Sequence, residues 1–280
     1  MIKKGTRFYT PDTLSELKEI IYKEQEVKLL AGGTSLFRKI NGDTLVLPGV
    51  IILLENIPEL TKENRTERYF EFGSMITIQN IIDNCKRNFA PVLIDALEKN
   101  APFPVRNIST IGAAIANNDI KSDLLPLFYV FNVKVEVINL RDKKIKARWE
   151  SLTQYLSTQD NRGLHLITRV RIPLINPAYY QYFKTGFKYN LFNEISFAAI
   201  ADLEKGNISS LSMAFNINNK KIIRTKDIDA ELIGKHIPIG LKSREALIQT
   251  FNDNLNRIEG LEDYQKFQMI QIILHFLEAF

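Results

Sequence analysis

The chain has 280 residues, of which 45% are hydrophobic and 25% are charged, and its formal net charge is +5. This composition is typical of a globular protein and excludes an intrinsically disordered one. No apolar run reaches the ~20 residues of a membrane-spanning helix, and the N-terminus lacks the apolar stretch of a secretory signal. Lysine and arginine are mixed with acidic residues and form no aromatic-rich basic stripe, which argues against nucleic-acid binding.

The chain contains a single cysteine, Cys85. One thiol forms no internal disulfide and cannot by itself hold an iron–sulfur cluster or a zinc ion. The three histidines show no metal-ligand spacing, and the sequence has no P-loop, G-x-S-x-G or G-x-G-x-x-G motif. We therefore expect a cytoplasmic protein with no metal site, and no classical nucleotide-binding motif is visible.

The N-terminal third predicts helices and short strands. The segment TPDTLSELKEIIYKE indicates a helix with Thr10 as its N-cap and Pro11 as its first helical residue. Short strands are expected at 27–31, 50–54 and 69–73. Helical spacing follows in TIQNIIDNCKRN and PVLIDALEKN.

The remainder predicts one more helix, several strands and a helical C-terminus. The apolar run LLPLFYVF indicates a helix that Ser122 or Asp123 caps. In VKVEVINL, valines alternate with Lys134 and Glu136, so we expect a half-exposed strand with these two side chains toward solvent. Another strand is expected in LHLITRVRIPL. Beyond a boundary near 176–181, strand-rich segments precede helical ones, which favours an α+β module.

The first stretch with candidate chemistry is LLAGGTSL, where a strand leads into Gly32-Gly33, two hydroxyl residues and an expected helix. In such a turn the backbone can approach a pyrophosphate. Consecutive amides, a helix N-terminus and the hydroxyls of Thr34 and Ser35 can then donate to an anion. Taken alone, a Gly-Gly pair after a strand more often marks an ordinary turn.

The second stretch is RNISTIGAAIANNDIKSD, which places short side chains just before the apolar run. Thr110, Gly112, Ala113 and Ala114 form a second place where the backbone can approach a ligand. Asp123, at the expected helix start, is a candidate acceptor for ligand hydroxyls. A long surface loop is the alternative, but two such stretches in one chain favour a shared ligand.

Several motifs in order resemble the FAD-binding subunit of the molybdenum hydroxylases, the medium subunit of xanthine dehydrogenase and carbon monoxide dehydrogenase. Residues 31–36 are similar to the family's A-G-G-T-[DS]-L, and residues 106–117 to its R-N-x-x-T-I-G-G-N-I-A-N. Residues 123–126 match D-L-x-P, LLENIPEL resembles D-L-S-x-I-P-E-L, and FKTGFK resembles K-V-G-x-R. The resemblance extends from about residue 6 to 215.

The resemblance implies an α+β fold with three parts. Two would be FAD-binding subdomains of the vanillyl-alcohol-oxidase/PCMH type, spanning residues 1–60 and 61–176. Residues 177–280 would form a C-terminal flavoprotein domain with a three-stranded sheet plus helices.

The resemblance also assigns a FAD site. Asn117 and Asp123 would face the ribityl or phosphate portion, and Ile167 or Thr168 would touch the isoalloxazine edge. Lys184 would lie near the flavin N1/C2 carbonyl, where a cation stabilises the charge that develops on reduction. Backbone amides of the two loops would hold the FAD pyrophosphate, at Leu29, Leu30, Ala31, Gly32, Gly33, Thr34, Ser35, Leu36, Thr110, Ile111, Gly112, Ala113 and Ala114.

The implied function is electron transfer. FAD in this chain would collect electrons from 2Fe-2S clusters on an iron–sulfur subunit and pass them to NAD or another acceptor. Molybdopterin and the substrate chemistry would lie on a further partner subunit, in a complex of the purine or xanthine type. No nucleic acid and no membrane span are expected.

Some residues depart from the family pattern and leave alternatives open. Ala113 and Ala114 replace Gly and Asn, and each lost contact to a charged group costs ~1.5–3 kcal/mol. Asp119 brings a negative charge near the expected phosphate site, and Lys188 replaces an arginine. A non-catalytic scaffold subunit with weakened or lost FAD binding is therefore the main alternative. A self-contained flavin oxidase is disfavoured, because neither loop offers a His or Cys for covalent attachment.

Overall fold

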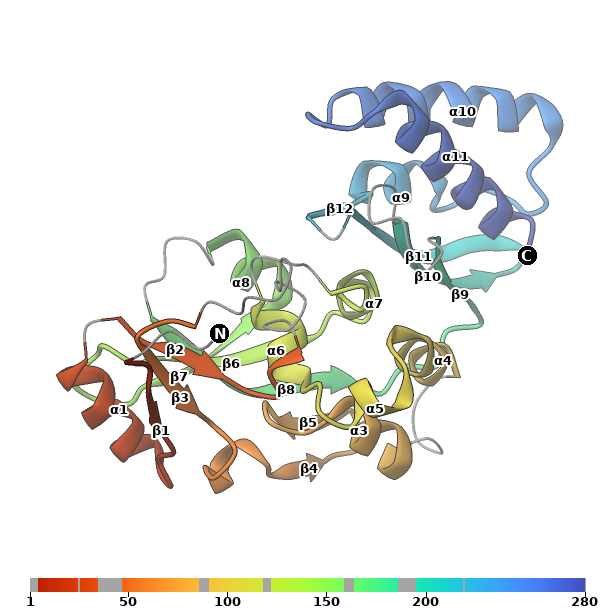
Figure 1. Ribbon diagram of the computed structural model, residues 1–280. Coiled ribbons are helices and arrows are strands. Elements are labelled where there is room, and N and C mark those ends of the chain that lie inside the picture. Colours follow the sequence, from red (N-terminus) through yellow and green to blue (C-terminus); the bar gives the residue numbers. More distant parts are fainter. Residues whose placement is uncertain are drawn as a thin grey trace. The chain divides into compact units, whose positions relative to one another are not determined.

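The computed structural model describes residues 5–24, 26–34, 47–85, 91–117, 122–158, 164–185, 195–218 and 220–279. The chain divides into two compact units, each containing helices and sheet (Figure 1). This arrangement confirms the mixed α+β class. Within the described ranges, no helix is long and apolar enough to cross a membrane. The first unit comprises residues 1–124 and 131–175, and the second comprises residues 125–130 and 176–280.

The first unit begins with a three-stranded parallel sheet in the order β1-β3-β2. The central strand β3 is buried, as its run of β-branched residues predicts. Helix α1 connects β1 to β2 and buries Leu17 and Ile21, one turn apart, in the same apolar cluster as β3. The bounds are β1 (Arg7–Tyr9), α1 (Leu14–Lys23), β2 (Lys28–Leu30) and β3 (Val50–Leu53).

Helix α1 begins three residues later than the sequence predicted. Its N-cap is Thr13, whose Oγ1 accepts a hydrogen bond from the Glu16 amide at 3.1 Å. The Glu16 carboxylate in turn accepts from the Asp12 amide at 2.9 Å. The predicted start at Thr10 and Pro11 is therefore wrong, because this reciprocal pair satisfies two amides further along the chain.

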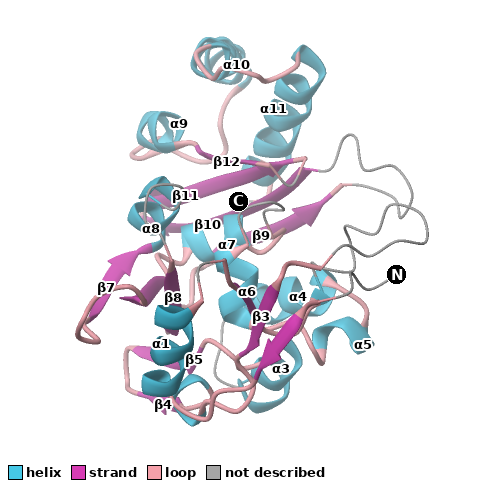
Figure 2. Cartoon of the chain, turned by 60° about the vertical axis from the view of Figure 1, so that its left-hand side comes forward, coloured by secondary structure: helices cyan, strands magenta, loops and turns pink. Residues whose placement is uncertain are grey.

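A five-stranded antiparallel sheet in the order β4-β5-β8-β6-β7 completes the framework of the first unit (Figure 2). One face is apolar: the register places Val170 opposite both Phe72 and Val135, and all three are fully buried. The other face carries polar side chains. The strands are β4 (Glu63–Arg65), β5 (Tyr69–Gly73), β6 (Lys134–Asn139), β7 (Ala147–Ser151) and β8 (His165–Pro173).

Short helices accompany this sheet. Helix α3 packs against α4 and α5, and α6 lies against β8 (Figure 1). These helices place the second small-residue stretch beside the strands of the sheet. Their bounds are η1 (Pro58–Leu60), α3 (Ile78–Cys85), α4 (Pro91–Asn100), α5 (Phe103–Arg106), α6 (Ile111–Ala116) and α8 (Leu152–Thr158).

The second unit is a four-stranded antiparallel sheet in the order β12-β11-β10-β9 with four described helices. The sequence predicted three strands and missed β12, a run of only four residues that pairs with the end of β11. The elements are α7 (Leu125–Val130), β9 (Tyr179–Lys184), β10 (Ile195–Glu204), β11 (Asn207–Ile217), β12 (Lys221–Arg224), α9 (Lys226–Leu232), α10 (Leu241–Asn256) and α11 (Asp263–Leu277).

Helix α7 belongs to the second unit, although the chain on either side of it belongs to the first. It packs against β10 and β11, and all six of its residues are buried. A helix that is apolar all round requires such burial. The three-part division of the chain at residues 60 and 176 stays a prediction.

A buried carboxylate ties α9 to the sheet of the second unit. Asp229 is 6% exposed, and its carboxylate accepts hydrogen bonds from Thr225 Oγ1 at 2.9 Å and from the Met213 amide at 3.3 Å. Removal from water is the larger influence and raises the pKa of Asp229 to about 6. The two hydrogen bonds and the charge of Arg224 lower this pKa and limit the rise.

Candidate functional site

The first small-residue loop leaves the C-terminal end of β2. Leu29 and Leu30 lie in the strand and pair with β3, and Ala31–Thr34 follow as half-buried residues. Within the described part of the chain, the amides of Ala31, Gly32 and Gly33 donate to no other residue. These consecutive amides are therefore available to an anion. The predicted contacts of Ser35 and Leu36 lie outside the described residues.

Gly32 has no room for a side chain. A Cβ built on it would overlap the carbonyl oxygen of Ile108, which lies in the second loop. Gly33 follows with a φ of 71°, in the left-handed region that favours glycine. Gly32 is thus required by the packing of one main chain on another, and Gly33 is favoured by its own backbone conformation.

The second loop begins helix α6, and its amides have partners within the protein. Four of them donate hydrogen bonds that fix the first turn of α6, and their assignment to a bound pyrophosphate stays a prediction. The four bonds are Ile111 to the Ile76 carbonyl (3.0 Å), Gly112 to the Ser74 carbonyl (2.9 Å), Ala113 to Thr110 Oγ1 (3.3 Å) and Ala114 to the Thr110 carbonyl (3.0 Å).

Gly112 is the glycine of this loop that the fold requires. A Cβ on Gly112 would lie 2.5 Å from Ser74 Cβ and 2.8 Å from the Ser74 carbonyl oxygen. Ala113 and Ala114 are half-buried and adopt ordinary helical backbone within α6. Replacing glycine at position 113 therefore introduces no backbone strain.

The structure brings the two loops together. Ser109 Oγ donates a hydrogen bond to Thr34 Oγ1 at 3.4 Å across 75 residues of sequence, beside the contact of Gly32 with Ile108. The two stretches of small residues therefore form one half-buried surface, with hydroxyls from both loops and amides from the first. Sequence reasoning did not single out Ser109, because an isolated serine in a loop carries no pattern.

The other residues predicted to contact FAD differ in their position and burial. Asn117 is the C-cap of α6, and its amide donates to the Ala113 carbonyl at 3.1 Å. Asp123 is 6% exposed and Ile167 is 2% exposed, so both side chains are covered by the protein itself. Lys184 lies in the second unit at the end of β9, opposite Ser196 in β10, and is half-buried.

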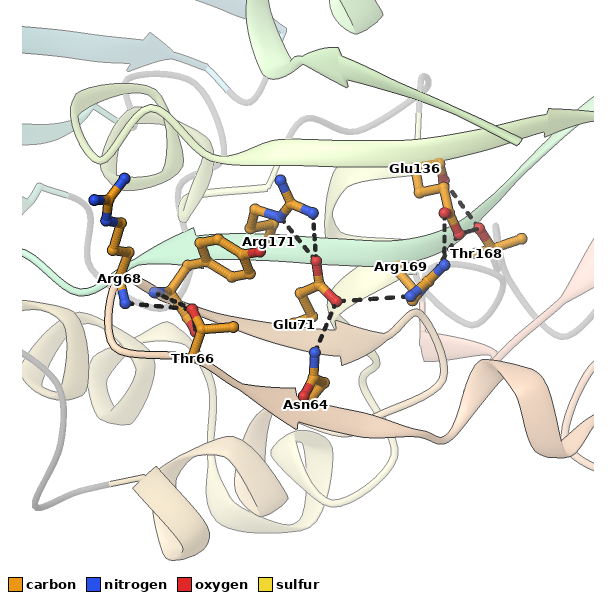
Figure 3. A network of polar contacts seen from close by, with 9 residues as sticks. Asn64, Thr66, Arg68, Glu71, Glu136, Thr168, Arg169 and Arg171 are labelled. Carbon is orange, nitrogen blue, oxygen red and sulfur yellow. Dashed lines mark hydrogen bonds and ion pairs between the residues drawn. The ribbon is translucent and has the colours of Figure 1, made fainter. Parts of the chain in front are cut away.

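Sequence reasoning missed a polar network on the outer face of the five-stranded sheet (Figure 3). Glu71 and Glu136 are only 5% and 6% exposed, and each accepts two hydrogen bonds from one arginine. Arg171 pairs with Glu71, and its guanidinium lies over the ring of Trp149 with 4.0 Å to the centroid. Arg169 pairs with Glu136, whose hydrogen bonds raise the pKa of Arg169.

The expectation that Glu136 points to solvent is therefore wrong. Strand alternation places its side chain on the outer face, as predicted, but the arginine of the neighbouring strand covers it there. A buried carboxylate is retained only when it is paired and hydrogen-bonded, and the partner comes from a strand 33 residues further along the chain. The sequence of β6 therefore gives no indication of which residue pairs with Glu136.

The paired loops, with their hydroxyls and available backbone amides, define a class of protein that can bind an anionic ligand at this surface. The chain belongs to the family described as the FAD binding domain in molybdopterin dehydrogenase, whose model matches residues 4–175. The resemblance inferred from the motifs is thereby confirmed, and so is FAD as the cofactor of the domain.

Two relatives match most of the chain. The nicotine 6-hydroxylase medium subunit of Paenarthrobacter nicotinovorans is 26% identical over 236 residues, which cover 82% of this chain and 81% of that protein. The glyceraldehyde dehydrogenase medium chain of Sulfolobus acidocaldarius is 22% identical over 227 residues, which cover 81% and 80%.

A solved structure has the same fold. The match is a chain of carbon monoxide dehydrogenase from Hydrogenophaga pseudoflava, with a TM-score of 0.79 and 20% identity over 100% of this chain and 99% of that chain.

Proposed function

We propose that the chain is the FAD-carrying electron-transfer subunit of a molybdenum hydroxylase of the xanthine dehydrogenase-like type. It would receive electrons from the iron–sulfur clusters of a partner subunit and pass them to NAD or another acceptor. The observation that carries the proposal is the meeting of the two small-residue loops at Thr34 and Ser109, within the residues that the FAD-domain family matches. The medium subunits among its relatives support the place of the chain in such a complex.

The chain's own residues would bind and orient the cofactor. The amides of Ala31, Gly32 and Gly33 would donate to the pyrophosphate, and the hydroxyls of Thr34 and Ser109 would lie at the same surface. When bound, FAD supplies a carrier that accepts electrons singly and delivers them in pairs. Lys184 is proposed to stabilise negative charge on the reduced flavin.

The remaining parts of the proposal concern the partners and the setting. With one cysteine in 280 residues, the chain has too few thiols for an iron–sulfur cluster, so clusters and molybdopterin would lie on partner subunits. We also propose that the protein is cytoplasmic and that its complex is of the purine or xanthine type. The subdomain layout is proposed to be that of the vanillyl-alcohol-oxidase/PCMH type.

A second candidate is a scaffold subunit that has weakened or lost FAD binding. It is favoured by the four amides of α6 that are already bonded within the protein, and by Ala114, which cannot supply the hydrogen bond of the family's asparagine. Under this proposal the fold is kept for assembly of the complex.

One experiment separates the two candidates. The full-length chain is purified, its visible absorbance is recorded, and its thermal unfolding is measured with and without added FAD. Flavin absorbance, release of FAD on denaturation and a higher melting temperature with FAD support the electron-transfer subunit. A colourless protein that FAD does not stabilise supports the scaffold.

A further inference from the structure

Strand β8 contains a bulge at Thr168. Glu136 of β6 pairs with Arg169, but the next residue, Val137, pairs with Ile167, so Thr168 is an extra residue in β8. A bulge interrupts the alternation of side chains between the two faces of a sheet, and it changes the direction of the side chain at that position. Thr168 accordingly points toward Glu136, on the same side as Arg169 (Figure 3).

The bulge is fixed by hydrogen bonds to the buried carboxylate of Glu136. Thr168 is 5% exposed, and its hydroxyl donates to the Glu136 carboxylate at 2.6 Å. The same carboxylate accepts from Arg169 Nε at 2.8 Å and Arg169 Nη2 at 2.7 Å. Because hydrogen bonds to a buried charge are strong, they hold the peptide of Thr168 in one orientation.

The main chain of Thr168 connects this network to the second loop. Its carbonyl oxygen accepts a hydrogen bond from the Ser74 amide at 2.9 Å, in the turn between β5 and α3. The Ser74 carbonyl accepts from the Gly112 amide at 2.9 Å, and Gly112 leaves no space between α6 and that turn. The turn is also paired with the second loop through an isolated bridge between Thr77 and Thr110.

We propose that Thr168 and Glu136 are positioning residues for the flavin site, acting through the turn at Ser74 on the first residues of α6. This inference rests on the proposed FAD-binding function. The neighbouring carboxylate Glu71 is as buried as Glu136 and accepts hydrogen bonds from Arg171; it makes no hydrogen bond to Thr168 and reaches Arg169 Nη1 as an ion pair at 3.6 Å. A glutamine at position 71 keeps an acceptor for Arg171 and leaves the three hydrogen bonds to the Glu136 carboxylate in place, so it should destabilise the sheet without releasing Thr168.

The test uses three variants of the full-length chain. Thr168→Val removes the hydroxyl and keeps the shape, Thr168→Ser keeps the hydroxyl, and Glu71→Gln is the matched control. Each is measured for thermal unfolding, for the dissociation constant of FAD by quenching of flavin fluorescence, for the spectrum of bound FAD, and for amide hydrogen exchange of residues 109–114.

We expect Thr168→Val to weaken FAD binding about ten-fold, the effect of one lost charge-assisted hydrogen bond. It should also speed exchange of the Gly112 amide and alter the bound spectrum. Thr168→Ser should restore all three properties. Glu71→Gln should lower the melting temperature yet leave FAD affinity within about two-fold, because Glu71 is connected to the bulge through a 3.6 Å ion pair with Arg169 and not through a hydrogen bond to Thr168.

Unchanged exchange and unchanged affinity in Thr168→Val would overturn the inference, and so would a loss of affinity in Glu71→Gln equal to that in Thr168→Val. If the unsubstituted chain binds no FAD, the proposed function fails instead. The exchange measurement still decides in that case whether Thr168 positions the second loop.

Discussion

Gly32 and Ile108 lie so close that no side chain fits between the Cα of the first and the carbonyl oxygen of the second. The contact joins two loops that are far apart in the sequence, and it is made entirely by main chain. Together with the hydrogen bond from Ser109 to Thr34, it assembles the surface of the candidate FAD site from protein contacts alone. The described part of this surface, from Ala31 to Thr34 and from Ile108 to Ala114, is therefore held in place by the protein itself, which lowers the entropic cost of binding.

The close packing of Gly32 against Ile108 predicts the effect of adding a single methyl group at position 32. Gly32→Ala should destabilise the chain by ~1–3 kcal/mol, because the Cβ forces the loops apart, and should abolish FAD binding. Urea unfolding and flavin fluorescence measure the two effects. Gly49→Ala is the control, because nothing lies within 4 Å of a Cβ at that exposed position. A Gly32→Ala protein of normal stability would show that the loops are not in contact.

The alanines of α6 allow a gain-of-binding experiment. Ala114→Asn restores the family's side chain at a half-buried helical position. We expect FAD to bind several-fold more tightly, because one hydrogen bond to a charged group outweighs the lower helix propensity of asparagine, ~0.5 kcal/mol. Titration of FAD against Ala114→Asn and the exposed control Ala116→Asn measures the difference. Weaker binding in Ala114→Asn alone would mean that the loop is adapted to alanine.

The proposed role of Lys184 predicts a change in redox potential. Lys184→Met removes a partly exposed cation worth ~1 kcal/mol, so the two-electron potential of bound flavin should fall by ~20 mV. Spectroscopic titration with a reductant measures the potential, and Lys134→Met serves as a control on an exposed strand position. Equal redox potentials of bound flavin in the two variants would show that Lys184 does not lie near the flavin.

The buried carboxylate of the second unit predicts a pH dependence. Because the pKa of Asp229 is raised to about 6 in the folded state, the folded protein binds its proton more tightly than the unfolded chain does. The free energy of unfolding should therefore fall as the pH rises from about 4 to about 6, by up to ~3 kcal/mol from this group.

Asp229→Asn removes this contribution and can keep both hydrogen bonds, since its amide can donate to Thr225 and its oxygen can accept from Met213. Its stability relative to the natural chain should be greater at pH 7 than at pH 4. Urea unfolding at both pH values tests this, and a constant difference would contradict the raised pKa.

The sequence by itself determined which segments form most of the strands and helices, and which residues carry the small-residue motifs. Apolar periodicity located β3, β5 and β8, and the ordered motifs led to the FAD family, because both signals are local. The start of α1 was misplaced because Thr10 and Thr13 are both acceptable caps, and only the pairing of Thr13 with Glu16 chooses between them.

Only the tertiary structure decided which groups the loop residues contact within the protein. The Gly112 amide donates to the Ser74 carbonyl, in a turn that lies 38 residues earlier in the chain. Glu136 was expected in water, but Thr168 and Arg169 reach it from another strand. In each case the deciding group is distant in sequence, and a hydrogen bond forms only where the folded chain brings donor and acceptor within reach.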